Sequence, residues 1–151
     1  MCWLQRALSE ARLLLLGAGA TGTEAVKNLV LPGVGHVHVV DGRTVTADDC
    51  ADNFFVTQAH MGQPLARVTQ ELLVEMNPDV TGSFDVAEPL AFAAGASALS
   101  SYTLVIATQM TYPQAAELDA LCRAAGVPLI VRADASPRYH ADSQPLLLLH
   151  R

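Results

Sequence analysis

The fold of this chain is decided by residues 13–22, LLLLGAGATG, where an apolar run leads directly into the pattern Gly-x-Gly-x-x-Gly. Four leucines without polar alternation predict a strand that is buried on both faces. Gly17 permits a tight turn, Gly19 lets the backbone approach a phosphate, and Gly22 lets the following helix pack closely on the strand. The N-terminus of that helix then faces the anion. The stretch therefore predicts an α/β fold of the dinucleotide-binding type.

Asp41 supports this prediction because it ends a second apolar run, residues 36–40 (HVHVV), nineteen positions after Gly22 (41 − 22). This is close to the spacing expected for the carboxylate that binds a ribose hydroxyl in such folds. A residual nucleotide site is therefore assigned to four residues: Gly17, Gly19, Gly22 and Asp41.

Composition restricts the class of protein. The chain has 151 residues, of which 51% are hydrophobic and 16% charged, so we expect one globular domain. The net charge is -6 and the nine basic residues are scattered, which argues against nucleic acid as a partner. The leucine runs are too short to span a membrane, and the N-terminus does not resemble a signal peptide. We expect a soluble intracellular protein of the cytoplasm or the nucleus.

The rest of the chain alternates between strand and helix patterns. Strands are predicted at 13–16, 37–40, 79–86, 102–107 and 127–131. Helices are predicted to end near residues 11 and 31, and to cover 67–76, 113–125 and, more weakly, 90–99. Such alternation predicts a Rossmann-like, doubly wound and mostly parallel sheet. Residues 133–144 have a loop pattern and 145–150 suit either a short strand or an apolar tail, so we divide the chain into a domain at 1–132 and a tail at 133–151.

Several blocks of sequence resemble the adenylating domain of the ubiquitin-like-protein activating enzymes and of their bacterial MoeB and ThiF relatives. These blocks are GAGATG at 17–22, NLVLPGVG at 28–35, Asp41 and GQP at 62–64. The regulatory subunits of the heterodimeric neddylation activating enzymes match more specific blocks: TGTE at 21–24, DNFF at 52–55, NPDVTGSF at 77–84 and ATQ at 107–109.

Three positions depart from the active members of this family. Those members use Mg-ATP to adenylate the carboxylate of a modifier, which requires cations at the phosphates and a carboxylate near the metal. The resemblance places Asp52 at the family's arginine, Leu65 at its lysine and Gln109 at its metal-associated aspartate. It thus implies a domain that has lost its charge-neutralising groups and has no catalytic residue.

The resemblance also implies a partner. An inactive half of this kind pairs with a catalytic subunit, which holds the ATP, and contacts the ubiquitin-like modifier through the complex. We expect this chain to be such a non-catalytic regulatory subunit or a truncated remnant of one. We assign no cofactor and no metal to this chain. Phe54 and Phe55 suit either the core or an apolar patch that faces the partner.

Two other functions are compatible with the glycine motif. An NAD(P)-dependent oxidoreductase is favoured by Gly17, Gly19, Gly22 and Asp41, but no Tyr-x-x-x-Lys pair or comparable proton donor is evident, and Lys27 is the only lysine. An active MoeB-like or ThiF-like adenylating enzyme would need cations that positions 52 and 65 do not provide.

For the other candidate reactive residues, a structural role is a better interpretation than a catalytic or metal-binding one. His36 and His38 lie on one face of a predicted strand, yet no third metal ligand is evident. Cys122 falls on a predicted helix as a small buried thiol, and Cys50 lies among aspartates that disfavour a thiolate. Neither cysteine suits a thioester.

Overall fold

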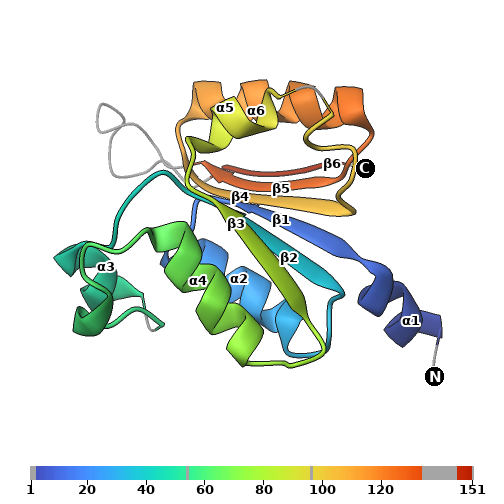
Figure 1. The fold of residues 1–151 in the computed structure, drawn as a ribbon. Helices are drawn as coiled ribbons and strands as arrows, with labels where there is room; N and C mark the ends of the chain where they lie inside the picture. Colours follow the sequence, from blue (N-terminus) through green and yellow to red (C-terminus); the bar gives the residue numbers. More distant parts are fainter. Residues whose placement is uncertain (1–2, 54, 96, 134–145, 151) are drawn as a thin grey trace.

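The computed structural model describes residues 3–53, 55–95, 97–133 and 146–150, which contain a six-stranded sheet with helices on both faces (Figure 1). The strand order is β3-β2-β1-β4-β5-β6. Five strands are parallel, and β6 pairs antiparallel with β5. Their bounds are β1 (Arg12–Leu16), β2 (His36–Val40), β3 (Thr81–Asp85), β4 (Leu104–Met110), β5 (Leu129–Ala133) and β6 (Leu146–His150). The predicted doubly wound, mostly parallel sheet is confirmed.

Two layers of helices cover the sheet. In Figure 1, α2 (Ala20–Val30) and α4 (Leu65–Glu75) lie on one face, and α5 (Pro89–Ala93) and α6 (Tyr112–Ala125) on the other. Helix α1 (Trp3–Glu10) precedes β1 at the lower edge of the sheet. A short helix α3 (Ala47–Asp52) and a 3₁₀ turn η1 (Gln58–His60) form the connection between β2 and α4.

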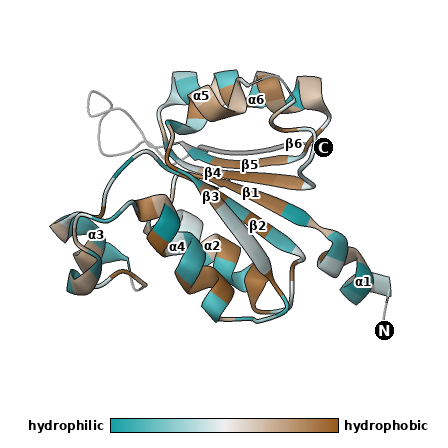
Figure 2. Cartoon of the chain, in the orientation of Figure 1, coloured by the Kyte–Doolittle hydropathy of each residue, from teal (hydrophilic) through white to brown (hydrophobic). Residues whose placement is uncertain are grey.

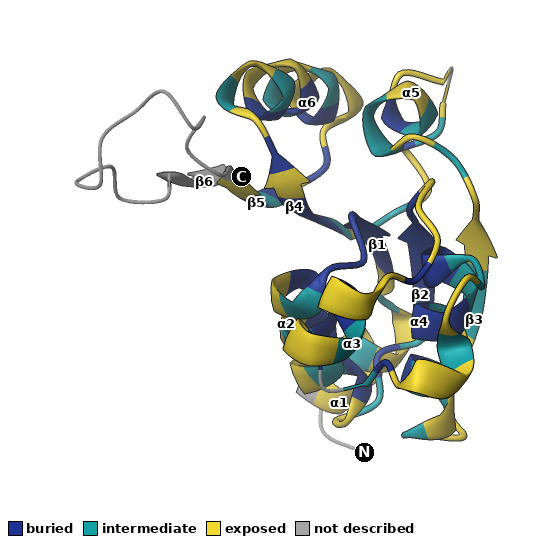
Figure 3. Cartoon of the chain, turned by 90° about the vertical axis from the view of Figure 1, so that its left-hand side faces the viewer, coloured by how far each residue is buried: buried dark blue, intermediate teal, exposed yellow. Residues whose placement is uncertain are grey.

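The core lies on both sides of β1. Leu13 and Leu15 pack with the apolar residues of α2 and α4, whereas Leu14 and Leu16 pack with those of α5 and α6. The central strands are accordingly hydrophobic in Figure 2 and buried in Figure 3, while the outer helix faces are exposed. The prediction of a strand buried on both faces is confirmed.

Most predicted elements differ in their bounds by one to three residues: β3 covers 81–85 instead of 79–86, β4 covers 104–110 instead of 102–107, and α4 covers 65–75 instead of 67–76. Two further differences have a clear physical reason. The helix expected over 90–99 ends at Ala93, because Gly95 is a poor helix former and Ser97 adopts a positive φ of 64°. The last parallel strand begins at Leu129 instead of 127, because Gly126 caps α6 with φ 69° and Pro128 follows it without an N–H group.

Helix α3 was not predicted. Thr46 and Asp49 form a capping box, in which the Thr46 hydroxyl accepts from the Asp49 amide and the Asp49 carboxylate accepts from the Thr46 amide at 2.9 Å. The pattern Thr-x-x-Asp was the available signal.

In the part of the chain that the structure describes, no helix is long and apolar enough to cross a membrane.

Candidate functional site

The candidate site lies where β1, β2 and β4 end together. Leu16 pairs with Val40 on one side and with Ala107 on the other, so Gly17, Asp41 and Thr108, the residues that follow, meet at one edge of the sheet. Ligands of open parallel sheets bind at this carboxyl edge. The sequence-predicted residues Gly17 and Asp41 are therefore brought together.

The glycines of the turn have different neighbours. Gly17 adopts a φ of 88°, and a Cβ there would lie 2.4 Å from the Thr108 carbonyl oxygen. A Cβ on Gly22 would lie 2.8 Å from the Gly17 carbonyl oxygen. Both glycines are thus required by the backbone packing of the turn itself. Gly19 is the N-cap of α2 and borders the cleft, with the flexible side chain of Gln109 as its neighbour.

Asp41 is 2% exposed and all of its hydrogen-bonding capacity is used. Its Oδ2 accepts from the Ala18 amide at 2.9 Å and from Nη2 of Arg43 at 3.0 Å. Its Oδ1 accepts from the Arg43 amide at 2.8 Å and from Arg43 Nε at 3.2 Å. A carboxylate offers about four acceptor positions, so the donors of Arg43 and Ala18 together occupy all the acceptor positions of Asp41.

Two cavities open on either side of Arg43. One, of about 370 Å³, lies at the N-terminus of α2, and the other, of about 570 Å³, lies between Asp41 and the residues around Glu88. Arg43, Thr108 and Gln109 line both cavities. The cleft at the end of the sheet is therefore divided, with Arg43 between its two parts.

The cavity at α2 has mixed charge. Three carboxylates and two guanidinium groups line it: Asp48, Asp49, Asp52, Arg43 and Arg132. Nη1 of Arg132 donates to the Thr21 hydroxyl at 3.0 Å, beside the first turn of α2. Two arginines from positions that the resemblance did not indicate thus reach the cleft.

Sequence reasoning missed both arginines. The available signal was their place after or at the end of a strand: Arg43 follows β2 by three residues, and Arg132 lies near the end of β5. Since the carboxyl ends of parallel strands converge, such residues meet in space although they are far apart in sequence.

The three positions that were predicted to depart from the active family members fall in different environments. Asp52 is exposed and lines the cavity at α2, and Gln109 lines both cavities. Leu65 is fully buried as the first residue of α4, within the core on the α2 side of the sheet. The structure therefore brings Asp52 and Gln109 to the cleft, whereas Leu65 is packed among apolar side chains.

Gln109 has an unusual backbone. Its φ is 61°, which a residue with a side chain rarely adopts, at the point where the register between β4 and β5 shifts. Its side-chain oxygen accepts from Nη2 of Arg43 at 2.8 Å. Nη2 of Arg43 thus donates to both Gln109 and Asp41.

The remaining candidates lie away from the cleft. His36 and His38 are on one face of β2, as predicted, and burial is the main cause that lowers the pKa of each. Among the described residues, no group of three or more His, Cys, Asp or Glu side chains could hold a metal ion. Cys122 is fully buried, as expected, and burial raises its pKa to about 11.

The two phenylalanines are only partly described. Phe54 lies outside the described residues. Phe55 is partly buried, and the Lys27 ammonium lies 5.6 Å from the centroid of its ring.

A glycine-rich turn between β1 and α2, with an acidic residue after β2, defines a Rossmann-like domain. The pattern of the ThiF family matches residues 3–140, and the chain belongs to this family. It is 39% identical to the NEDD8-activating enzyme E1 regulatory subunit of Gallus gallus and 42% identical to the NEDD8-activating enzyme E1 regulatory subunit AXR1 of Arabidopsis thaliana, each over 128 residues. The resemblance to these regulatory subunits is confirmed.

These matches cover most of this chain but only a small part of each relative. Each alignment covers 84% of this chain and 24% of the relative, so the chain spans about a quarter of their length. Among solved structures, E. coli MccB has the same fold, with a TM-score of 0.74 over 86% of this chain and 36% of that chain, at 16% sequence identity.

Proposed function

We propose that this chain is the nucleotide-domain portion of a non-catalytic regulatory subunit, which docks on a catalytic subunit to form an enzyme that activates a ubiquitin-like modifier of the NEDD8 type. The catalytic subunit holds the ATP and the modifier reaches this chain through the complex. The chain itself works without a cofactor, in the cytoplasm or the nucleus.

The observation that carries this proposal is the charge around the cleft. Transfer chemistry on ATP needs preorganised positive charge at the phosphates. Here Asp48 and Asp52 line the cavity at the N-terminus of α2, and the Arg43 guanidinium is already engaged by Asp41 and Gln109. Three carboxylates and two arginines line this cavity, and one of those arginines, Arg43, is already engaged. A triphosphate would therefore meet net negative charge at this place, which supports a role in binding a protein instead of in catalysis.

The relatives support the same proposal. They are regulatory subunits of a NEDD8-activating E1 enzyme, and the similarity covers 84% of this chain. The chain corresponds to only 24% of the length of those relatives, so their partner cannot be assigned to it from similarity alone. The experiment therefore tests whether this chain docks on a catalytic subunit.

The experiment is a co-elution assay. The purified chain is mixed with the catalytic subunit of a NEDD8-activating enzyme and run on a size-exclusion column, and ATP–pyrophosphate exchange is measured for the chain alone and for the mixture. We expect a joint peak, and no exchange by the chain alone. The catalytic subunit alone serves as the reference for both readouts.

Three results would contradict the proposal. A chain that is folded by circular dichroism but elutes separately from the catalytic subunit does not dock. Exchange by the isolated chain would instead indicate an active adenylating enzyme, and tight binding of NAD would indicate an oxidoreductase.

A further inference from the structure

We infer that Arg43 determines what the cleft can bind, because its side chain occupies the positions on Asp41 that a nucleotide's ribose would need and keeps the two cavities separate. This inference concerns the cleft alone. It goes beyond the proposed function, since docking on a catalytic subunit does not depend on it.

The first step is the occupancy of Asp41. A ribose is recognised in folds of this kind by donating its hydroxyl protons to the carboxylate after the second strand. The four acceptor positions of Asp41 are taken by the amides of Ala18 and Arg43 and by two nitrogens of the Arg43 side chain. The two amides are fixed by the backbone. A ribose can therefore reach Asp41 only if the Arg43 side chain leaves.

The second step is what holds Arg43 in place. Its Nη2 donates to Asp41 Oδ2 at 3.0 Å and to Gln109 Oε1 at 2.8 Å, and its Nη1 lies 3.6 Å from Asp49 Oδ1. Hydrogen bonds between charged partners are stronger than neutral ones, and a guanidinium suits such planar bridging. Asp41 is buried, so the departure of Arg43 would leave its charge unpaired.

The third step is the shape of the cleft. A nucleotide in this fold spans from the carboxylate to the N-terminus of the helix after the glycine turn. Here Arg43 and Gln109 line both cavities and lie between them, and Gln109 contacts the position of Gly19. The larger cavity beside Asp41 is mostly apolar and takes a ligand the size of a base or nucleoside, once Arg43 is displaced.

The experiment compares the chain with its Arg43→Ala variant by isothermal titration calorimetry, using adenosine, AMP and ATP as probes. Adenosine is the decisive probe because it has the ribose without phosphate charge. We expect Arg43→Ala to bind adenosine about tenfold more tightly than the original chain. The gain should be smaller for ATP, because the variant also loses a cation facing the phosphates.

Three variants complete the test. Arg123→Ala removes an exposed arginine of α6 that pairs with Asp119, and it should leave adenosine binding unchanged. Adding Asp41→Asn to Arg43→Ala should abolish the gain. If Arg43→Ala does not fold, Gln109→Ala is used, which removes one of the acceptors of Arg43 and should give a smaller gain.

The inference is overturned by equal adenosine affinity in the original chain and in Arg43→Ala, or in Gln109→Ala where the first variant does not fold. It is also overturned if the gain persists with Asp41→Asn, because Asp41 is then not the group that Arg43 masks. A loss of ATP affinity in Arg43→Ala without any gain for adenosine would assign Arg43 to the phosphates instead. None of these outcomes changes the result expected in the co-elution assay.

Discussion

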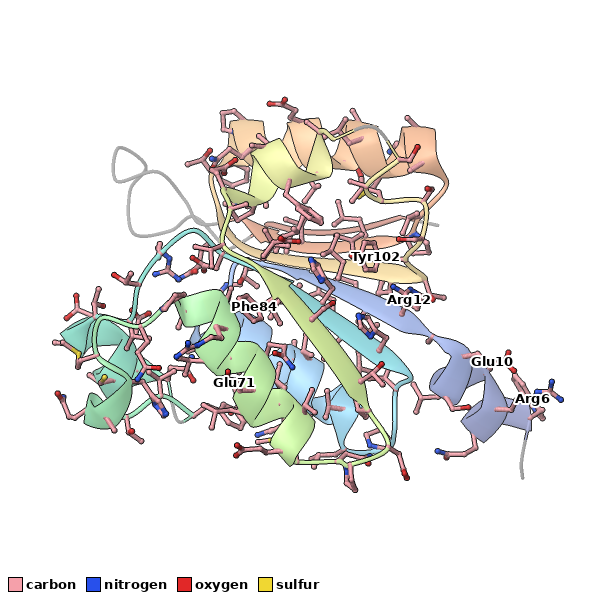
Figure 4. All side chains as sticks on the ribbon, in the orientation of Figure 1. Arg6, Glu10, Arg12, Glu71, Phe84 and Tyr102 are labelled. Carbon is pink, nitrogen blue, oxygen red and sulfur yellow. The ribbon has the colours of Figure 1, made fainter. Side chains whose placement is uncertain are left out.

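The hydroxyl of Ser83 on β3 lies 2.6 Å from Nδ1 of His38 on β2, which joins the two strands through their side chains. The same hydroxyl lies 2.9 Å from Nε2 of His36. His38 also stacks on Phe92 of α5 with ring centroids 5.4 Å apart. Nearby on this face, the Arg12 guanidinium at the start of β1 lies 5.9 Å from the centroid of the ring of Tyr102, which precedes β4; Figure 4 labels both residues.

These contacts continue in both directions and end at acceptors. Beyond His36, its Nδ1 lies 2.8 Å from the Thr81 hydroxyl, which in turn donates to the Gly35 carbonyl at 2.9 Å. Beyond His38, its Nε2 lies 3.1 Å from Asp85 Oδ2. A carbonyl and a carboxylate donate nothing.

The four hydrogen bonds that join these groups need four protons, and two hydroxyls and two neutral imidazoles supply them. His38 Nε2 lies close to Asp85 but makes no hydrogen bond among the described residues. Because both histidines share the Ser83 hydroxyl, we expect them to titrate as a coupled pair, one proton at a time.

The first prediction concerns pH. Burial is the largest cause that lowers the pKa of both His36 and His38 below 6.5, with the Arg12 charge also lowering both and Asp85 opposing it at His38. Below pH 6.5 the unfolded chain then binds more protons than the folded chain, so the free energy of unfolding should fall as pH drops through this range. Urea titrations between pH 5 and 8, with the histidine ring signals followed by NMR, test this.

The Asp85 carboxylate provides the control for that prediction. Asp85→Asn removes the charge that raises the pKa of His38, so that pKa should fall further, whereas Asp79→Asn on the loop before β3 should leave it unchanged. Histidines that both titrate independently at or above pH 6.5 would contradict the coupled chain.

The second prediction concerns the glycine turn. Gly22→Ala places a Cβ against the Gly17 carbonyl oxygen and the Thr108 hydroxyl, which are held by the sheet, so we expect a loss of about 1–3 kcal/mol in the free energy of unfolding. Gly19→Ala meets only the flexible side chain of Gln109 and should cost less. Urea unfolding followed by circular dichroism compares the two variants, and equal losses would count against this assignment of roles.

The third prediction concerns charge at the cavity beside α2. Asp52→Arg exchanges an exposed carboxylate that lines this cavity for a cation, so ATP affinity should rise by about tenfold at low ionic strength. Adenosine affinity should not change, because adenosine has no phosphate. Calorimetry at two salt concentrations measures both, with Asp79→Arg, on the loop before β3, as the matched charge change. A gain of the same size for adenosine would show that charge is not the cause.

The fourth prediction concerns the partner surface. We expect Phe55→Ala to weaken co-elution with the catalytic subunit while leaving the circular dichroism spectrum unchanged, because an aromatic ring that is only partly buried can contribute contact area to an interface. Phe84→Ala, at an exposed phenylalanine of β3, is the comparison. If only the Phe84 variant weakens co-elution, the interface lies at β3 instead.

Most of the fold could be predicted because its signals are local. The uninterrupted leucines of β1 and the Gly126 that ends α6 follow from burial and from backbone conformation within a few residues. The bounds were less accurate where a short signal competed, as at Gly95 and Pro128. Helix α3 depends on one capping box within an acidic stretch, which has little apolar periodicity.

The site could be predicted only in part because it is assembled across the sequence. Asp41 was recognised by its spacing in the sequence from the glycine motif. Its neighbour Arg43 belongs to no sequence motif that would predict an ion pair with Asp41. The contact between Arg43 and Gln109 joins residues that are 66 positions apart, through a backbone conformation at Gln109 that its residue type disfavours. Such a relationship becomes visible only once the strands are placed in register.

The register of β1 with β2 and β4 stops at Leu16, Val40 and Ala107, and everything at the cleft lies one residue or more beyond it. The apolar pairs that hold the sheet together and the polar residues that could contact a ligand thus occupy different positions along the same chain segments. Mutations can exchange the second set without disturbing the first. One sheet can therefore support clefts of different chemistry.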